Sequence, residues 1–285
     1  MPKKILIQLD CDPQPSTFDA VVAIDAGAEV LLRHGGVTPE NVTPLVHGAM
    51  FTRGGDDLKA TAIFVGGSDV SAAEAVADRV RGTFFGPVRV GVLVDPNGAN
   101  TTASAAVIAA ARHVTLDAEC RAVVLGGTGP VGQRVARLLA GKGVRVTLAS
   151  RSPAKAAAAV GRIGAAVPHA AVAAATADGP LGEALATADV IVAAGAAGIM
   201  LLDAAGRRQA EAARVIIDLN AVPPAGVEGV VATDKARPEG RTVLYGALGI
   251  GGTKMKIHRA AVARVFADQA AFLDAEELLG IGEQL

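Results

Sequence analysis

The sequence contains no tryptophan, one tyrosine and only two cysteines among its 285 residues. Cys11 and Cys120 are too few for a disulfide framework, and they do not form a cluster with the spacing of a metal site. We therefore expect a protein of a reducing compartment, the cytoplasm, that binds no metal ion.

An excess of charge and a long apolar run are also missing. The formal net charge is −1, so nothing in the electrostatics favours nucleic acid or an anionic membrane as a partner. No segment approaches the roughly 18 apolar residues of a membrane span, and the longest candidate, 165–175, is interrupted by Pro168 and His169. Residues 1–4 are too short and polar for a signal sequence. We expect neither a membrane nor a nucleic-acid partner.

What the chain does have is a hydrophobic fraction of 51% and a length that suggests about two domains. In the first hundred residues, predicted strands at 4–9, 61–65 and 88–94 alternate with helices. These helices begin after Ser16, at Thr38 and at Asp69 or Ser71, and a further one spans 101–112. This alternation predicts an α/β fold with a parallel sheet, whose carboxyl edge is where ligands bind.

The most informative stretch follows the predicted strand at 123–125. Gly127, Gly129 and Gly132 form a Gly-x-Gly-x-x-Gly pattern that leads into a helical segment. In a dinucleotide-binding turn the first glycine permits the turn, the second lets a pyrophosphate approach, and the third lets helix and strand pack closely. The predicted cofactor residues here are Gly127, Thr128, Gly129, Pro130, Val131 and Gly132. The alternative is a glycine-rich turn in a domain that binds no nucleotide.

The next predicted strand, 144–149, ends in Ser150, Arg151 and Ser152. An NAD site of this kind usually has an acidic residue at that point, and this sequence has none. Hydroxyl donors and an arginine suit a 2′-phosphate, so we predict NADP as the cofactor, with NAD as the alternative. Arg151 could instead be an ordinary solvated surface residue.

Further strands are predicted at 190–193, 215–218 and 244–245. A glycine-rich hinge is predicted at 246–252, followed by helices at 253–267 and 274–279 that return to the first domain. The predicted division is a substrate domain of residues 1–112 plus 253–285 and a Rossmann-type NADP-binding domain of residues 113–252. The active site is expected in the cleft between them.

Two long motifs are more specific than the glycine pattern: Asn-Gly-Ala-Asn-Thr-Thr at 97–102 and Gly-Ala-Leu-Gly-Ile-Gly-Gly at 246–252. With the segments 16–19, 51–55, 61–67, 127–132, 218–224, 232–235 and 253–259, they make the chain resemble the methylene-tetrahydromethanopterin dehydrogenases of methylotrophic bacteria from end to end. The resemblance implies hydride transfer from the methylene carbon of a reduced pterin to NADP, or sometimes NAD, in formaldehyde oxidation. It also implies two α/β domains with a cleft between them and a homo-oligomer, for which a trimer or a hexamer is possible.

Such a hydride transfer leaves a methenyl cation and moves no proton, so the enzyme needs alignment and a nearby carboxylate rather than a general base. Asp19 is the predicted carboxylate, although it could simply belong to the helix cap begun by Ser16. Lys256 is predicted to bind the pterin carbonyl or to hold a carboxylate. Other predicted contacts are Asn97, Asn100, Thr101 and Thr102 with the substrate, where one of Asn100 and Thr101 could instead cap a helix, and Asn220 beside the nicotinamide. Asp203 and Asp234 are interpreted as surface residues.

Three alternatives stay open. The first is the same reaction on methylenetetrahydrofolate, without cyclohydrolase activity. The related bifunctional folate enzymes pair a tyrosine with a lysine a few residues further on for that activity, and Tyr245 here has no lysine before Lys254. The second is a reductase of the shikimate-dehydrogenase type, which needs a Lys–Asp pair such as Lys59 with Asp95. The third is a non-catalytic NADP sensor.

Overall fold

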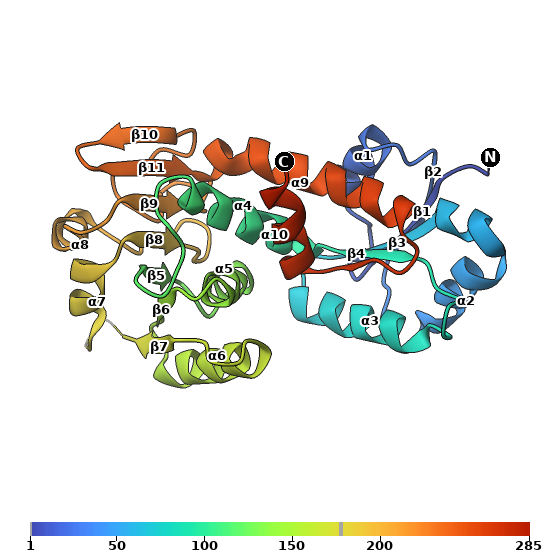
Figure 1. The fold of residues 1–285 in the computed structure, drawn as a ribbon, viewed down its shortest axis with the longest axis horizontal. Helices are drawn as coiled ribbons and strands as arrows, with labels where there is room; N and C mark the ends of the chain where they lie inside the picture. Colours follow the sequence, from blue (N-terminus) through green and yellow to red (C-terminus); the bar gives the residue numbers. More distant parts are fainter. Residues whose placement is uncertain (1, 177–178) are drawn as a thin grey trace. The chain divides into compact units, whose positions relative to one another are not determined.

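The computed structural model describes residues 2–176 and 179–285, and it confirms the predicted α/β class with parallel sheets (Figure 1). The chain separates into two compact units. The first consists of residues up to 101 together with residues 255–285, and the second of residues 102–254. Both junctions fall inside helices, α4 (Ala99–Ala111) and α9 (Ala247–Ala267).

The first unit contains a five-stranded sheet in the order β12-β4-β3-β1-β2, in which all neighbouring strands are parallel. Its strands are β1 (Ile5–Asp10), β2 (Val30–His34), β3 (Thr61–Gly66), β4 (Gly91–Val94) and β12 (Phe272–Leu273). Its helices are α1 (Thr17–Asp25), α2 (Thr43–Phe51), α3 (Val70–Thr83) and α10 (Ala275–Glu283), with the short 3₁₀ helices η1 (Gly55–Ala60) and η2 (Pro96–Gly98). Every residue of β3 and β4 is buried, which makes these strands the centre of the core.

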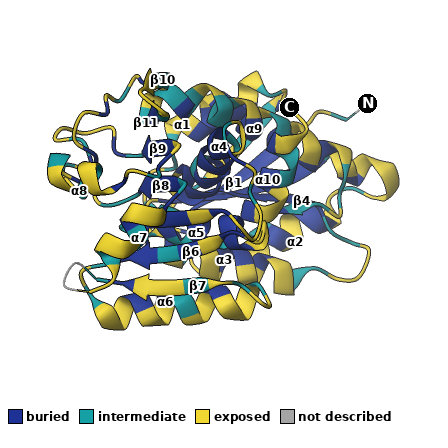
Figure 2. Cartoon of the chain, turned by 60° about the vertical axis from the view of Figure 1, so that its left-hand side comes forward, coloured by how far each residue is buried: buried dark blue, intermediate teal, exposed yellow. Residues whose placement is uncertain are grey.

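The second unit contains a seven-stranded sheet in the order β10-β11-β9-β8-β5-β6-β7. Its strands are β5 (Arg121–Leu125), β6 (Arg145–Ala149), β7 (Val172–Ala175), β8 (Val190–Ala193), β9 (Val215–Asp218), β10 (Lys235–Glu239) and β11 (Thr242–Gly246). Its helices are α5 (Pro130–Gly141), α6 (Pro153–Ala166), α7 (Leu181–Thr187) and α8 (Ala204–Gln209). Figure 2 shows the buried central strands β8 and β9 in dark blue.

This second sheet has the strand order of a Rossmann fold. Apart from β10, which is antiparallel to β11, the paired strands are parallel, and the order reverses between β5 and β8. A ligand of such a sheet binds beyond the carboxyl ends of the strands at this reversal. The candidate ligand-binding segments are therefore the turn after β5 and the loops after β6, β8 and β9.

The helix predicted to begin at Thr38 is wrong, because α2 begins at Thr43. The Thr38 N–H donates to Asn41 Oδ1 (2.8 Å), and Asn41 Nδ2 donates to the Gly36 carbonyl oxygen (3.0 Å). These side-chain hydrogen bonds hold a turn in place of the first helical turn. The short strands β2, β7, β10 and β12 were also missed, and β4 begins at Gly91 rather than at residue 88.

The predicted glycine-rich hinge at 246–252 is also wrong, because Ala247 already begins α9. The N–H groups of Leu248 and Gly249 donate to the Ala232 carbonyl oxygen (2.8 and 3.2 Å). A Cβ atom at Gly246 or Gly249 would overlap backbone carbonyl atoms of residues 231–234. Close packing of two backbone segments, and not flexibility, therefore accounts for these two glycines.

Candidate active site

The turn after β5 has the predicted strand–turn–helix form. Gly126 adopts φ +69°, and α5 follows with Gly129 as its N-cap and Pro130 as its first residue. A Cβ atom at Gly127 would lie 2.5 Å from Leu148 Cγ, and one at Gly132 would lie 2.7 Å from the Gly126 carbonyl oxygen. The left-handed residue of the turn is thus Gly126, whereas Gly127, which was predicted to permit the turn, and Gly132 are required by close packing.

The start of α5 fits a pyrophosphate. The N–H groups of Val131 and Gly132 lie in the first turn of the helix, where no helical acceptor exists, and Pro130 has no N–H to satisfy. A Cβ atom at Gly129 would be 3.4 Å from the Gly126 carbonyl oxygen, so the turn leaves its backbone approachable at that point. Helix N-termini of this kind bind anions through their free N–H groups and their dipole.

Three hydroxyl groups gather where β6 ends beside this turn. Ser150 Oγ lies 3.4 Å from Thr128 Oγ1 and accepts a hydrogen bond from the Ser152 N–H (3.2 Å). The Ser152 side chain caps α6 by accepting from the Lys155 N–H (3.3 Å). Arg151 is exposed, and no hydrogen bond or ion pair joins its side chain to a residue that the structure describes. The cluster therefore combines hydroxyl donors with an available cation.

The loop after β9 is organised by a buried carboxylate. Asp218 accepts hydrogen bonds from the N–H groups of Asn220 and Val227 (both 3.0 Å), and burial raises the pKa of its carboxyl group. Asn220 is itself buried, donates through Nδ2 to the Pro224 carbonyl oxygen (3.1 Å) and accepts from the Val222 N–H (3.0 Å). Its side chain shapes the loop that was predicted to border the nicotinamide.

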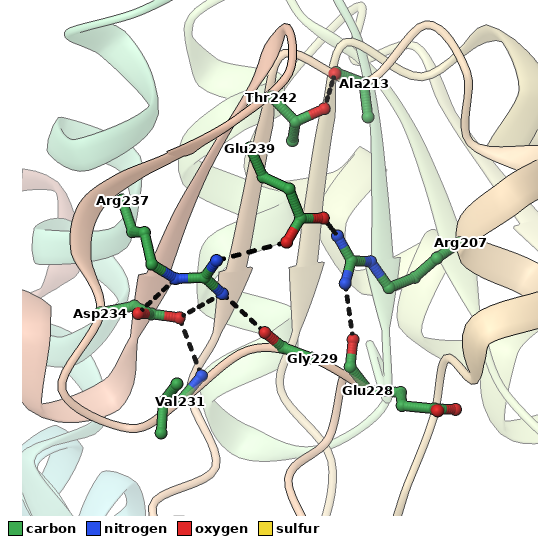
Figure 3. A network of polar contacts seen from close by, with 9 residues as sticks. All are labelled: Arg207, Ala213, Glu228, Gly229, Val231, Asp234, Arg237, Glu239 and Thr242. Carbon is green, nitrogen blue, oxygen red and sulfur yellow. Dashed lines mark hydrogen bonds and ion pairs between the residues drawn. The ribbon is translucent and has the colours of Figure 1, made fainter.

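Asp234, interpreted from the sequence as a surface residue, is buried, and that interpretation is wrong. Arg237 donates to both of its carboxylate oxygens, from Nε (2.7 Å) and from a terminal nitrogen (3.0 Å), and the Val231 N–H donates as well (2.8 Å). Figure 3 shows how Arg237 also contacts Glu239, which Arg207 pairs from the other side. The two arginines further bind the Glu228 and Gly229 carbonyl oxygens, so the network fastens the segment 228–234.

The replacement Asp234→Asn is expected to lower the free energy of unfolding by about 2 kcal/mol at neutral pH, because charge-assisted hydrogen bonds are lost. Pairing with Arg237 lowers the pKa of Asp234, so this contribution is present above the pKa of the unfolded carboxyl group. The difference between wild type and variant should therefore shrink as the pH falls below about 4. Urea unfolding at a series of pH values measures this difference. The control is Asp56→Asn, which removes the exposed carboxylate that pairs with Lys59 and should leave the free energy of unfolding unchanged. A difference that does not vary with pH would contradict the charge assignment.

In the first unit a fully buried carboxylate, Asp95, follows β4. It accepts hydrogen bonds from the Asn100 N–H (3.0 Å), the Thr101 N–H (3.0 Å) and Thr101 Oγ1 (2.7 Å). Asn100 Nδ2 donates to the Val94 carbonyl oxygen (2.6 Å) and to Asp274 Oδ1 (2.7 Å). Both Asn100 and Thr101 are fully buried, so the structure places them in support of the loop rather than on its surface.

His258 completes this buried group. Its ring stacks on Phe64 with centroids 5.8 Å apart, and its Nδ1 lies 4.0 Å from Asp95 Oδ2. The sequence alone predicted no function for His258. The signal that could have found the group is the position of Asp95 directly after a buried strand.

Asn97 differs from its neighbours in the motif. It is exposed and adopts φ +53°, next to Gly98 at φ +60°. Asparagine tolerates this left-handed conformation better than most residues, but it still stores strain, which is common at binding sites. Thr102 is partly exposed and begins the second unit. Of the four predicted substrate residues, Asn97 and Thr102 are therefore the two with accessible side chains.

Asp19 lies in the first turn of α1, which follows the carboxyl end of β1, and it is largely buried. The cap is made by Ser16, whose Oγ accepts from the Asp19 N–H (3.2 Å). In a capping box the Asp19 carboxylate would accept from the Ser16 N–H, but that N–H donates to Asp10 Oδ2 (3.0 Å). The Ser16 N–H is thus bonded to Asp10, which follows β1 directly.

The two lysines named from the sequence lie in different settings. Lys256 is exposed on α9. Lys59 pairs with Asp56 (2.7 Å) before β3, whereas Asp95 follows β4, which is parallel to β3. The length of one strand, about 20 Å for six residues, separates those two ends. Lys59 and Asp95 therefore do not supply the Lys–Asp pair that a shikimate-type mechanism needs.

Within residues 2–176 and 179–285, no three His, Cys, Asp or Glu side chains are grouped as a metal site. No helix in this part of the chain is long and apolar enough to cross a membrane.

Comparison with known families gives two adjoining matches. The profile described as methylene-tetrahydromethanopterin dehydrogenase, N-terminal, matches residues 17–97, and the one described as shikimate / quinate 5-dehydrogenase matches residues 109–236. The second match and the strand order agree on a Rossmann-like unit.

Individual proteins are similar over nearly the whole chain. The bifunctional protein MdtA of Methylorubrum extorquens is 43% identical over 100% of both chains. The NAD(P)-dependent methylenetetrahydromethanopterin dehydrogenase of the same organism is 34% identical over 89% of each chain. Among solved structures, quinate dehydrogenase from Corynebacterium glutamicum in complex with NAD has a TM-score of 0.52 and 17% identity over 99% of each chain, which shows a shared fold.

Proposed function

Because the chain belongs to the family of the methylenetetrahydromethanopterin dehydrogenases, we propose that it oxidises methylene-tetrahydromethanopterin to the methenyl form by hydride transfer to NADP. The observation that carries this proposal is the similarity to the methanopterin enzyme over most of both chains. The glycine turn at the start of α5 supports it, because the turn provides free N–H groups for a dinucleotide pyrophosphate.

The reaction requires the protein to align the pterin with the nicotinamide, and it requires no acid–base catalysis. A bound nicotinamide supplies the hydride acceptor. Positive charge develops on the two nitrogens that flank the reacting carbon of the pterin, and no proton is transferred. A carboxylate that is preorganised near that charge lowers the barrier, because it needs no reorganisation during the reaction.

Asp19 is our proposed carboxylate, since it lies in the first turn of α1, just beyond the carboxyl end of β1 where a parallel sheet binds its ligands, and is largely screened from water. Asn97 and Thr102 are the proposed pterin contacts. Asn100 and Thr101 are proposed to act indirectly. Their hydrogen bonds to Asp95 hold the strained turn that carries Asn97. The exposed Lys256 is proposed to bind the pterin carbonyl group. In this proposal residues 1–112 and 253–285 form the substrate domain, and residues 113–252 the cofactor domain.

The preference for NADP over NAD rests on the hydroxyl cluster at the end of β6. Thr128, Ser150 and Ser152 supply donors, and Arg151 supplies a guanidinium with no partner among the described residues. A guanidinium binds a phosphate through two parallel hydrogen bonds.

The replacement Arg151→Ala is expected to raise the KM for NADP about 10-fold or more while leaving the KM for NAD unchanged, because only NADP carries the 2′-phosphate. Steady-state kinetics with each coenzyme measure this. The matched control is Arg241→Ala, which removes an exposed arginine between β10 and β11 and should change neither constant. Equal changes for both coenzymes would contradict the assignment.

The activity itself is tested by following the absorbance of NADPH with purified protein, methylene-tetrahydromethanopterin or methylenetetrahydrofolate, and NADP or NAD. Turnover with the methanopterin substrate is expected. Turnover with only the folate substrate would establish the alternative dehydrogenase, and tight NADP binding without any turnover would favour a sensor.

We further propose a homo-oligomer, a trimer or hexamer, in the cytoplasm. The exposed side of α1 carries Phe18, Val21 and Ile24, three apolar residues at helical spacing whose exposed fractions are 54%, 56% and 49%. Clustered exposed apolar side chains favour association. Sedimentation velocity tests this, and a monomer at micromolar concentration would contradict it.

A further inference from the structure

Gln133 connects the glycine turn to α6. It is the fourth residue of α5, and its Nε2 donates to the Thr128 carbonyl oxygen (2.8 Å). Its Oε1 accepts from Arg162, through Nε (3.1 Å) and a terminal nitrogen (2.8 Å).

The direction of this hydrogen-bond chain is fixed by its two ends. A guanidinium can only donate, so the atom of Gln133 that faces Arg162 must be the oxygen. A backbone carbonyl can only accept, so the atom that faces Thr128 must be the amide nitrogen. Glutamine therefore meets both requirements at once, whereas glutamate meets only the one at Arg162.

With this contact, both polar atoms of the peptide group between Thr128 and Gly129 are hydrogen-bonded. The carbonyl oxygen of that peptide binds Gln133, and its N–H donates to the Gly126 carbonyl oxygen (3.1 Å). With both polar atoms bonded, the peptide plane cannot rotate freely. It leads directly to Val131 and Gly132, whose N–H groups form the proposed anion site.

We propose that Gln133 is a positioning residue for the cofactor pyrophosphate, with Arg162 as its anchor. This proposal rests on the dinucleotide site of the proposed function. Gln133 holds the turn in its binding conformation before the cofactor arrives, and it does so with a neutral side chain. A carboxylate at this position would face the Thr128 carbonyl oxygen and would place a negative charge beside the incoming pyrophosphate.

The variant that separates positioning from folding is Gln133→Glu. Its new carboxylate can pair with Arg162, so the thermal midpoint should not fall. Binding of NADPH and of NADH should each weaken at least 10-fold, because the pyrophosphate is common to both. Gln133→Ala, which loses the hydrogen bond without adding charge, should weaken both about 5-fold. Arg162→Ala should have a smaller effect, because this residue is exposed.

The experiment is a titration of the enzyme with NADPH and with NADH, followed by coenzyme fluorescence in the absence of pterin. The control variant is Gln209→Glu, which adds the same charge at the end of α8. The chain runs from there to the start of β9, at the edge of the sheet opposite the glycine turn, so this variant should bind both coenzymes as the wild type does. Unchanged binding by Gln133→Glu would overturn the proposal. So would a loss confined to NADPH, which would assign Gln133 to the 2′-phosphate, or a fall in thermal midpoint that accounts for the weaker binding. If wild-type protein binds neither coenzyme, the proposed cofactor site fails together with this inference.

Discussion

Alanine at position 132 is expected to weaken NADPH binding by about 10- to 100-fold. The added Cβ atom would lie 2.7 Å from the Gly126 carbonyl oxygen and 2.8 Å from Gly127 Cα, so the turn must open to admit it. Overpacking of this kind costs about 1–3 kcal/mol, and here the cost falls on the conformation that presents the free N–H groups of α5. Fluorescence titration with NADPH measures the effect.

The same helix provides the control. Gly141 is the last residue of α5, and a Cβ atom there would meet no atom of the described residues within 4 Å. Gly141→Ala should leave NADPH binding unchanged. If Gly132→Ala and Gly141→Ala bound NADPH equally well, the close approach of helix and turn would not be what positions the cofactor.

Gly249→Ala should lower the free energy of unfolding by at least about 3 kcal/mol. A methyl group at this position would overlap the Asp234 carbonyl group, and Asp234 is itself fastened by Arg237 and by the Val231 N–H. Because the clash is with backbone held on several sides, neither segment can move without breaking hydrogen bonds. Urea denaturation measures the change in the free energy of unfolding.

Gly252→Ala, three residues further along α9, should instead raise the free energy of unfolding. Its Cβ atom would meet nothing within 4 Å among the described residues, and alanine favours a helix over glycine by about 1 kcal/mol. If both variants lost the same stability, glycine in α9 would have to be explained by something other than the approach of residues 231–234.

The features that depend on neighbouring residues could be predicted well from the sequence. The helix caps at Ser16 and Asp69 and the strand–turn–helix at 123–139 follow from contacts within a few positions. The edge strands β2 and β12 of the first sheet could not be predicted, because β2 contains no fully buried residue and β12 is only two residues long, so neither gives a clear apolar pattern. The helical form of 246–252 was missed for another reason, since residues 231–234 are what the glycines accommodate.

By itself, the sequence determined the family, the α/β class and the location of the dinucleotide turn, because long motifs and local periodicity encode them. Only the tertiary structure decided which polar residues are available for chemistry. It buried Asn100, Thr101 and Asp234 in hydrogen bonds and left Asn97 and Arg151 exposed. It also brought Gln133 between Thr128 and Arg162. The physical reason is that a side chain's role depends on which groups desolvate it and satisfy its hydrogen bonds. The folded backbone sets that environment, and some of the partners come from segments distant in the sequence, as Asp274 does for Asn100 and Arg162 for Gln133.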